Sequence, residues 1–544
     1  MKVQYCLIVL ALFFLVINLF ACTSDDNKSG TGSDDDGGHS TDDDSGDDDS
    51  ADNILPKPCA DIYAQDILPT FEVEMTQDDW NALVYEFEHW QDLENQGKPI
   101  KNYYPITTFR YKDEAIKNAM IRLRGYPPGW TSSKMQFNVS FKEINSELRF
   151  HGLRQIDLSA ADNDPTILRN RLGFSIFQDI RIPASCVNNA KLVINGEYYG
   201  LYANLEHIDK EFLQRNFGKK DDDGNLYKFE ALKTNEDVGD TSDLDQFQSA
   251  KDLADLDKIL DLDESVLEWA GEAVMPHIDG FWVGGANYYL YHHPTRGFLF
   301  FPYDIDYAFE AGDFNADPIT YTVPWGFGKP AQFTIVVSDP GWFQKYLDDL
   351  EFVLAAYNTD TVLNRIDEWA AQISDAVSED PNRPFSFDDH NNEVQKLRNF
   401  IGDRAYFVQT WINCKKHAGD SETVQYGGKQ YYFWHSICSW DDALNHCKYL
   451  GGTLAVPTNE LEQNFVANKA NEILVNNWWT GANDIGHEGT WTTPDNISLT
   501  YLPWGTGQPD GDNTQNCVAL DKDLNWLWND LACSEYYTSV CELP

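Results

Sequence analysis

A group of residues in the middle of the chain has side chains of the kinds that phosphate chemistry requires. Transfer of a phosphoryl group needs a lysine on the nucleotide phosphates, a carboxylate to accept the hydroxyl proton, and carboxylate and amide oxygens to hold metal ions. Asp304 follows the apolar residues 298–302 and precedes Ile305, so the end of a strand would project its carboxylate into a cleft. The chain supplies the remaining types in Lys134, Asp279 and Asn287.

Each of these residues is weak evidence by itself. A single lysine in a strand pattern usually lies at a solvated edge, and an aspartate before glycine, as in Asp279-Gly280, usually forms a turn. The pair His292-His293 does not indicate a zinc site. Adjacent residues of a strand point to opposite faces, and no third ligand follows at a familiar spacing.

The elements that must position these residues form a mixture of strands and helices. Alternating patterns predict strands at 119–124 and 135–141, and Leu and Ile on one face predict helices at 166–180 and 243–269. Residues 191–194 and 198–205 flank Asn195-Gly196, a pair that favours the type I′ turn of a β-hairpin. The region from Cys59 to Lys416 is therefore expected to be an α+β domain.

Three stretches of this region together resemble the CotH (spore coat protein H) family of atypical secreted kinases. The first combines Arg-Leu-Arg-Gly at 122–125 with Lys-Met-Gln-Phe at 134–137. The second is Asn-Gly-Glu-Tyr-Tyr-Gly at 195–200, which leads to Glu-His-Ile-Asp at 206–209. The third combines Asp-Gly-Phe at 279–281, Asn-Tyr-Tyr-Leu-Tyr at 287–291 and Tyr-Asp-Ile-Asp at 303–306. The resemblance implies a protein-kinase-like domain that transfers phosphate from ATP, with Mg²⁺ or Mn²⁺, to Ser or Thr of proteins.

The resemblance also implies a role for each candidate residue. Lys134 would lie on the strand that faces ATP, and Glu206 would position this lysine or the metal. Asp279 would be the catalytic aspartate. Asn287 would bind the second metal ion, and Asp304 would be the main metal-binding aspartate.

The sequence departs from this family pattern around two of these residues. Ala286 stands where the family often has His, and Tyr303 stands where it has Trp. Asn287 lies eight residues after Asp279, whereas the conventional kinase loop and some members place it five residues after. The insertion, which contains Gly284-Gly285, could re-aim or disable the loop. A kinase fold without catalysis, displayed as an adhesin, is therefore the alternative function.

The composition changes near residue 426, where Trp becomes frequent and cysteines gather. Ser439 and Asp442 form the Ser-x-x-Asp pattern of a helix N-terminus, and 458–474 is predicted to be a second helix. The whole segment resembles a C-type lectin domain, an α/β fold with long loops. The disulfides of that family map onto Cys447 with Cys541 and onto Cys517 with Cys533.

The lectin resemblance implies a Ca²⁺ site that also binds sugar hydroxyls through carboxylate and amide oxygens. Gln-Pro-Asp at 508–510 is the version associated with galactose-type sugars, so galactose is the first expectation. No Trp follows this motif to stack on galactose, and a glutamine replaces one acidic ligand. The alternative is a domain that binds protein surfaces. The positions of the expected site are Gln508, Asp510, Gln515, Asn529 and Asp530.

The N-terminal 22 residues predict export. Lys2 precedes an apolar run too short to span a bilayer comfortably, and Leu-Phe-Ala-Cys at 19–22 resembles the bacterial lipobox, which implies lipidation of Cys22. Residues 23–53 hold twelve Asp and one Lys with no apolar run, which predicts a flexible spacer. We therefore expect a lipid-anchored protein of the bacterial cell envelope, at the outer membrane or cell surface, that touches the membrane only through this lipid.

The charge of the chain excludes one class of partner. Its 88 Asp and Glu against 40 Lys and Arg give a formal net charge of −48 over 544 residues. Nucleic acid is excluded, because phosphate binding along a duplex needs a cationic surface. The ten cysteines favour an oxidising compartment. Sequence alone leaves the pairing of four of them open, namely Cys59, Cys186, Cys414 and Cys438.

The expected organisation is a signal peptide at 1–22, an acidic tether at 23–58, a CotH kinase-like domain at 59–416, a linker at 417–425 and a C-type lectin domain at 426–544. The lectin would bind a carbohydrate or glycoprotein and localise the kinase, which would modify surface proteins. Phosphorylation of a glycan or small molecule is a further alternative that the sequence does not separate from protein phosphorylation.

Overall fold

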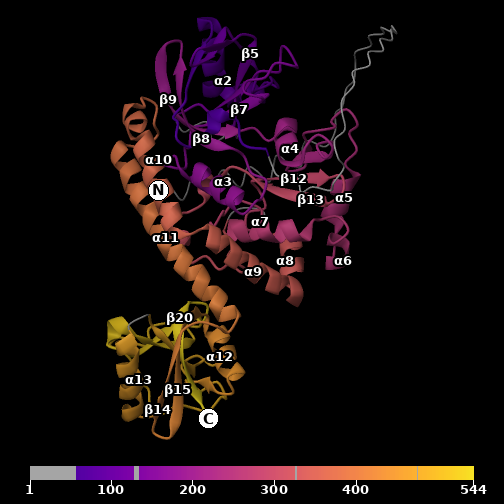
Figure 1. The fold of residues 1–544 in the computed structure, drawn as a ribbon. Coiled ribbons are helices and arrows are strands. Elements are labelled where there is room, and N and C mark those ends of the chain that lie inside the picture. Colours follow the sequence, from indigo (N-terminus) through magenta and orange to yellow (C-terminus); the bar gives the residue numbers. More distant parts are fainter. Residues whose placement is uncertain (1–56, 126, 128–133, 325–327, 474–475) are drawn as a thin grey trace.

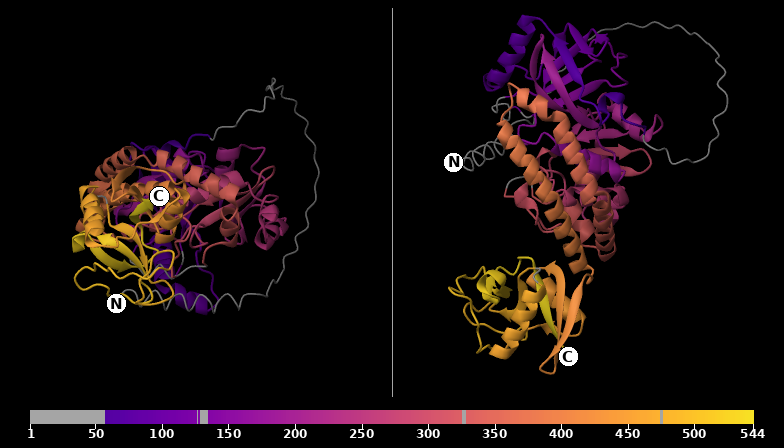
Figure 2. Two further views of the ribbon diagram at one scale, coloured as in Figure 1. Left: turned by 90° about the horizontal axis from the view of Figure 1, so that it is seen from below. Right: turned by 60° about the vertical axis from the view of Figure 1, so that its left-hand side comes forward.

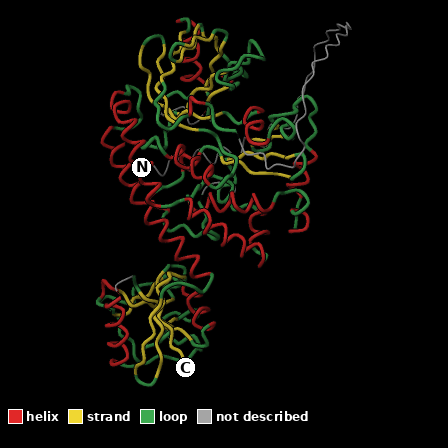
Figure 3. The backbone as a smooth tube through the Cα atoms, in the orientation of Figure 1, coloured by secondary structure: helices red, strands yellow, loops and turns green. Residues whose placement is uncertain are grey.

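The structure, a computed structural model, describes residues 57–125, 127, 134–324, 328–473 and 476–544. The predicted signal peptide with Cys22, and all but the last two residues of the predicted tether, lie outside the described residues. Figures 1 and 3 show a large α/β part followed by a smaller C-terminal part, joined by one long helix. Among the described residues, no helix combines the length and the apolar character needed to cross a membrane.

A nine-stranded sheet forms the N-terminal lobe, in the order β2-β5-β6-β7-β9-β8-β1-β3-β4. Its pairs are antiparallel except for β1 with β8. Its inner face packs a core rich in Phe and Ile, which includes Phe71, Phe109 and Phe150. The elements of this lobe are β1 (Thr70–Glu74), α2 (Gln77–Asn95), β2 (Tyr104–Ile106), β3 (Thr108–Tyr111), β4 (Glu114–Ile116), β5 (Ala119–Leu123), β6 (Phe137–Ser140), β7 (Gln155–Ser159), β8 (Val187–Ile194) and β9 (Glu197–Glu206).

A second lobe combines a four-stranded sheet, β11-β10-β12-β13, with most of the helices. Its apolar core continues from α3 through α7 and α9 to α11. The elements are α3 (Arg169–Asp179), α4 (Lys210–Phe217), β10 (Asn225–Lys228), β11 (Ala231–Leu232), α5 (Ser242–Ser249), α6 (Leu253–Leu256), α7 (Leu262–Val274), β12 (Tyr288–His293), β13 (Gly297–Pro302), α8 (Ala331–Val337), α9 (Pro340–Ala356), α10 (Thr359–Glu379) and α11 (Phe387–Lys415), with 3-10 turns at Ile305–Tyr307 and Ala311–Asp313. A further 3-10 turn at Asp61–Tyr63 packs in the core of the first lobe.

The predicted hairpin is confirmed. β8 and β9 are joined by Asn195 and Gly196, whose φ angles are 50° and 85°. Positive φ at both positions is what a type I′ turn requires, and Asn and Gly reach it at little cost. The strand predicted at 119–124 is confirmed as β5, whereas the one predicted at 135–141 is shorter, since β6 begins at Phe137.

The helix predicted over 243–269 is wrong as a single element. The structure has three helices there, because Asp252 and Asp261 each accept a backbone N–H and thereby start a new helix at α6 and α7. The helix predicted at 166–180 begins only at Arg169. Asp164 accepts the N–H groups of Thr166 and Arg169, and Ile167 has a positive φ of 57°, so the chain is not helical before that point.

The C-terminal domain is built on one sheet of order β14-β15-β20-β17-β18-β19, with β16 paired to β20. Trp478, Trp479, Trp491 and Trp528 are buried in its core. The helix predicted at Ser439 begins there, with Ser439 accepting the N–H of Asp442. The elements are β14 (Ser421–Tyr426), β15 (Lys429–Cys438), α12 (Trp440–Tyr449), β16 (Thr453–Leu454), α13 (Glu460–Ile473), β17 (Trp478–Asn483), β18 (Cys517–Asp521), a 3-10 turn (Lys522–Leu524), β19 (Leu527–Leu531) and β20 (Tyr537–Leu543).

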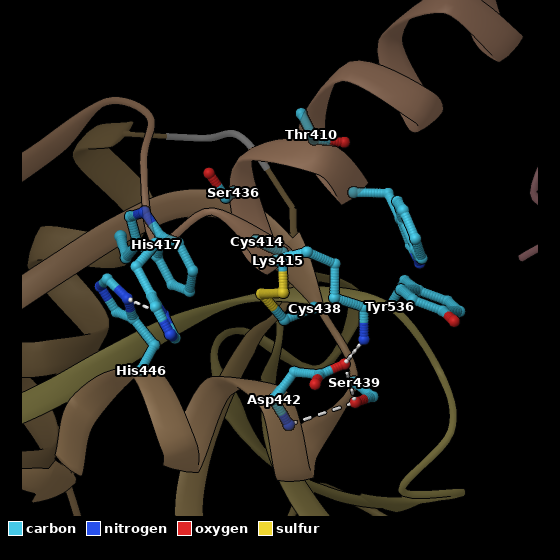
Figure 4. Close-up of a disulfide and its surroundings, with 12 residues drawn as sticks. Thr410, Cys414, Lys415, His417, Ser436, Cys438, Ser439, Asp442, His446 and Tyr536 are labelled. Carbon is cyan, nitrogen blue, oxygen red and sulfur yellow. Dashed lines mark hydrogen bonds and ion pairs between the residues drawn. A yellow bond between two sulfur atoms is a disulfide. The ribbon is translucent and has the colours of Figure 1, made fainter. Parts of the chain in front are cut away.

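The two domains are joined covalently and by polar contacts. Helix α11 runs from the large domain to the C-terminal domain (Figure 2), where Cys414 at its end forms a disulfide with Cys438 of β15. Figure 4 shows this disulfide with the neighbouring ion pair between Lys415 and Asp442. Residues 421–426 form β14 rather than the end of a linker, because they pair with β15. The predicted linker is therefore too long at its C-terminal end.

A histidine pair at this junction makes stability depend on pH. His446 is stacked on Trp434, and its Nδ1 lies 3.2 Å from Nδ1 of His417. Burial and the charge of His417 lower the pKa of His446 to about 4. The pKa of an unfolded histidine is about 6.5, so between these two values the unfolded chain binds a proton that the folded chain does not, and stability falls as pH falls.

We expect His446→Phe to weaken this pH dependence. The wild-type midpoint of urea unfolding should fall more between pH 7 and pH 4.5 than the midpoint of the variant, because the phenyl ring has no proton to gain. Urea titrations of both proteins at the two pH values check this. An equal fall in both proteins would show that His446 does not carry the effect.

Candidate functional site

The loop after α7 holds Asp279 in a buried polar network. The Oδ1 atom of Asp279 lies 3.2 Å from Nε2 of His277, whose other ring nitrogen lies 3.4 Å from Glu272. These carboxylates raise the pKa of the fully buried His277 well above its usual value, against the opposing effect of burial. Glu272 also accepts the N–H groups of Phe281 and Trp282, so its position is fixed by the loop.

Asn287 reaches Asp279 despite the three extra residues between them. Its Nδ2 donates to Oδ2 of Asp279 at 2.7 Å, and its N–H donates to the carbonyl of Asp279 at 2.8 Å. The insertion folds back against Asp279: a Cβ at Gly284 would lie 2.7 Å from Cα of Asp279. Glycine is therefore what allows this loop to close, and the insertion brings Asn287 back to the site.

Asp304 lies at the end of β13, as its position after an apolar run predicts. Its φ and ψ are 53° and 63°, in the left-handed region, and Nε2 of His277 lies 3.3 Å from its carbonyl oxygen. Asn170 accepts the N–H of the next residue, Ile305, at 2.9 Å. Left-handed backbone in a residue other than glycine often occurs at functional sites.

The carboxylates beside this loop suit a divalent metal ion. The Asp304 carboxylate makes no hydrogen bond or ion pair with the part of the chain that the structure describes. Burial, with the charges of Asp304 and Asp279, raises the pKa of Asp306 well above its usual value, so these groups lie close enough to repel. Mg²⁺ and Mn²⁺ prefer such oxygen ligands. Asp304 and Asn287 therefore fit a metal site, although no group of three or more His, Cys, Asp or Glu suited to a metal occurs among the described residues.

Lys134 does not have the position that was expected for it. It precedes β6 rather than lying in that strand, and its ammonium group is almost fully buried. Its Nζ donates to Asp380 at 2.7 Å and to the carbonyl of Leu201 at 2.5 Å, and it lies 4.3 Å from the ring centre of Tyr202. Burial lowers the pKa of Lys134, and the Asp380 carboxylate opposes this shift.

Glu206 does not position this lysine. Its carboxylate pairs with Arg215 at 2.8 and 2.9 Å and accepts the N–H of Cys186 at 3.0 Å. These contacts join the end of β9 to α4 and to the disulfide between Cys59 and Cys186. The partner of Lys134 is Asp380, which follows α10, so the expected role of Glu206 is corrected: it is a structural residue.

The C-terminal domain brings its expected site residues onto neighbouring segments. The Asp530 carboxylate accepts the N–H groups of Asp510 and Gly511 at 3.1 and 2.9 Å, which fixes the loop at 508–510 against β19. A Cβ at Gly511 would lie 2.1 Å from Oε1 of Gln515 and 2.8 Å from Oδ2 of Asp530. Three expected residues, Asp510, Gln515 and Asp530, therefore meet at this loop.

The remaining two residues differ in how free their oxygens are. Oε1 of Gln508 is buried and has no hydrogen-bond partner among the described residues. Nδ2 of Asn529 donates to Asp521 at 2.8 Å, which leaves its amide oxygen as an acceptor. An unpaired buried oxygen suits Ca²⁺, which takes six to eight oxygen ligands. The donors therefore fit a calcium ion.

Comparison with known proteins places both domains. The CotH kinase protein family matches residues 121–408, which is more than half of the chain. The chain belongs to the CotH kinase protein family. The C-type lectin domain matches residues 436–543, and the chain carries this domain after its CotH domain. Both disulfides expected of the lectin are present, between Cys447 and Cys541 and between Cys517 and Cys533.

Curated relatives of the CotH protein match its lectin domain. Perlucin from Haliotis laevigata is 34% identical over 115 residues, which are 21% of this chain and 74% of perlucin. C-type lectin domain family 17, member A from Homo sapiens is 30% identical over 25% of this chain, which spans 35% of that protein. A solved mouse scavenger receptor C-type lectin carbohydrate-recognition domain is 25% identical, with a TM-score of 0.21, and the match covers 22% of this chain and 93% of the mouse domain.

Two residues of the CotH site are missing from the sequence-based prediction. His277 stands two residues before Asp279, the spacing of the His-x-Asp pattern in the protein-kinase catalytic loop, so the sequence did contain a signal for it. Asp380 had no such signal. It lies 246 residues from Lys134, and only the packing of α10 against β9 brings the two together.

Proposed function

We propose that this CotH protein transfers phosphate from ATP to Ser or Thr hydroxyls of surface proteins and that its lectin domain localises it by Ca²⁺-dependent carbohydrate binding. The observation that carries the proposal is the meeting of Asp279, Asn287 and Asp304 around His277. One network of contacts therefore holds a carboxylate that can take up the hydroxyl proton, the amide of Asn287 and the backbone of Asp304, and phosphoryl transfer needs these residue types.

Each residue of the candidate site would have a separate role in phosphate transfer. Asp279, held by His277 and Asn287, would accept the proton of the attacking hydroxyl. Asp304 and Asn287 would hold Mg²⁺ or Mn²⁺, which neutralises charge on the transferred phosphate when bound. Lys134, oriented by Asp380, would contribute a positive charge beside the loop at 161–164, whose Asn163 donates to Asp306.

The first test is phosphate transfer by the wild type and by Asp304→Ala with ATP and Mg²⁺ or Mn²⁺. We expect the variant to lose autophosphorylation and metal-dependent nucleotide binding, because alanine removes the carboxylate that would hold the metal ion. Asp375→Ala, an exposed aspartate of α10, is the matched control and should behave as wild type. Absence of nucleotide binding by the wild type with either metal would refute the kinase function.

The lectin part of the proposal rests on Asp530 and the loop at 508–511. We expect Ca²⁺ to raise the thermal midpoint of the C-terminal domain, and Asp530→Asn to abolish this shift, because the loop loses the charge at its centre. Asp523→Asn, which changes a residue of the 3-10 turn after β18, is the control. Thermal scans with Ca²⁺ and with EDTA check this, and a glycan array with galactose-type and mannose-type sugars then tests specificity.

An adhesin without catalysis is the second candidate function, and the burial of Lys134 in its ion pair with Asp380 is the observation that favours it. An adhesin would bind its target equally well after Asp304→Ala and would depend on Asp530 and Ca²⁺. We further propose that Cys22 is lipidated and that the acidic segment holds both domains away from the outer membrane or cell surface. Mass spectrometry of the N-terminal peptide tests the lipid.

A further inference from the structure

Four cations gather beside the candidate site in a chain that is otherwise strongly acidic. Lys101 precedes β2 and Arg122 lies on β5. Lys228 is the last residue of β10, and Lys233 directly follows β11. The sheet of the first lobe and the hairpin of the second therefore each contribute two cations. Mutual repulsion is visible in the pKa of Lys101, which burial and the charges of Arg122, Lys228, Arg124 and Lys233 lower to about 8.

Cationic side chains contact Tyr303, the residue before Asp304, and thus lie next to the candidate site. Nζ of Lys228 lies 3.6 Å from the ring centre of Tyr303, and Nη2 of Arg124 donates to its hydroxyl at 2.9 Å. The guanidinium of Arg122 lies 5.3 Å from the ring centre of Tyr103, which directly precedes β2. Aromatic rings therefore hold two of the cations in place without neutralising them.

The four side chains are not neutralised by the protein. No carboxylate lies within 4.0 Å of the charged atoms of Lys101, Arg122, Lys228 or Lys233 in the described ranges, although the folded part of the chain has a large excess of Asp and Glu. The charge of Glu236 reaches Lys233 but does not offset the burial and the two neighbouring cations that lower the pKa of this lysine. Clustered cations without counter-charges cost stability, which a bound anion would restore.

We infer that Arg122, Lys228, Lys101 and Lys233 form a binding site for a phosphate-bearing ligand beside Tyr303, the residue before Asp304. Arginine and lysine are the side chains that recognise phosphate, the first through paired donors and the second as a point charge. The phosphate would belong either to the tail of the nucleotide or to an acceptor that is already phosphorylated. This site would serve the proposed kinase function, and its assignment rests on that function.

The test uses the full chain carrying Arg122→Gln and Lys228→Gln together as a double variant. It is compared with a control variant that loses the same charge elsewhere. The control is Lys258→Gln with Lys396→Gln, two exposed lysines that lie in the turn after α6 and in α11. Calorimetry measures binding of tripolyphosphate, which represents the nucleotide tail, and of a phosphoserine peptide beside its unphosphorylated form. We expect the double variant to weaken binding of one of these anions by about tenfold or more and the control to change it little.

Each outcome decides the inference. Loss of tripolyphosphate binding supports the nucleotide tail as the source, and loss of phosphopeptide binding alone supports a phosphorylated acceptor. Unchanged binding in the double variant, or an equal loss in the control, overturns the site. Because no readout involves catalysis, an inactive protein that still binds tripolyphosphate through these residues would refute only the proposed function.

Discussion

Replacing Asp279 with asparagine is expected to reduce the rate of phosphate transfer by about 10²–10⁴-fold, the range for loss of a general base. The amide keeps the size of the carboxylate but cannot take up the proton of the attacking hydroxyl. Nucleotide affinity should change little, since Asp304 holds the proposed metal. Autophosphorylation rates and nucleotide titrations of Asp279→Asn and wild type measure the two effects separately.

The pKa of His277 is a second quantity that should change in Asp279→Asn. The carboxylates of Asp279 and Glu272, 3.2 and 3.4 Å from the two ring nitrogens, raise the pKa of His277 against the opposing effect of burial. Removal of the Asp279 charge should lower the pKa of His277, which NMR of the ring protons detects. Asp375→Asn makes the same chemical change on an exposed face and should leave both readouts unchanged. A wild-type transfer rate in Asp279→Asn would exclude this residue as the base.

Asp380→Ala is expected to destabilise the CotH domain by about 3–5 kcal/mol, the usual cost of breaking a buried ion pair. The Asp380 carboxylate accepts from Nζ of Lys134 at 2.7 Å, and both side chains are almost completely buried. It also accepts the N–H groups of Leu201 and Asn382 at 2.9 and 2.8 Å. The alanine variant would leave a buried ammonium group, the buried N–H of Leu201 and the partly buried N–H of Asn382 without their acceptor.

Urea unfolding of the full chain measures this loss of stability. Asp380→Asn keeps an acceptor of the same shape and should recover part of the stability, whereas Asp375→Ala on the preceding helix should cost little. A further variant, Gly200→Ala, tests the same buried contact, because a Cβ at Gly200 would lie 2.6 Å from Oδ1 of Asp380 and would crowd that carboxylate. A small change in the free energy of unfolding on Asp380→Ala would mean that the Lys134 ammonium group becomes solvated or pairs with another group.

Both domain families and several local structures could be predicted from the sequence. The Asn195-Gly196 hairpin and the start of α12 at Ser439 depend on contacts within about four residues, so neighbouring residues decide them. The place of Asp304 at the end of β13 follows from the apolar run before it. The lectin disulfides followed from the family pattern.

The partners of the charged residues were decided only by the tertiary structure. Lys134 pairs with Asp380, 246 residues away, and Glu206 pairs with Arg215 instead. The cations beside Tyr303 come from two lobes, and Asp317 of the CotH domain accepts a hydrogen bond from Tyr536 of the lectin domain. A buried charged group pairs with the oppositely charged group that packing brings within contact distance. The whole fold sets the distance between the two groups, and the neighbours in the sequence do not.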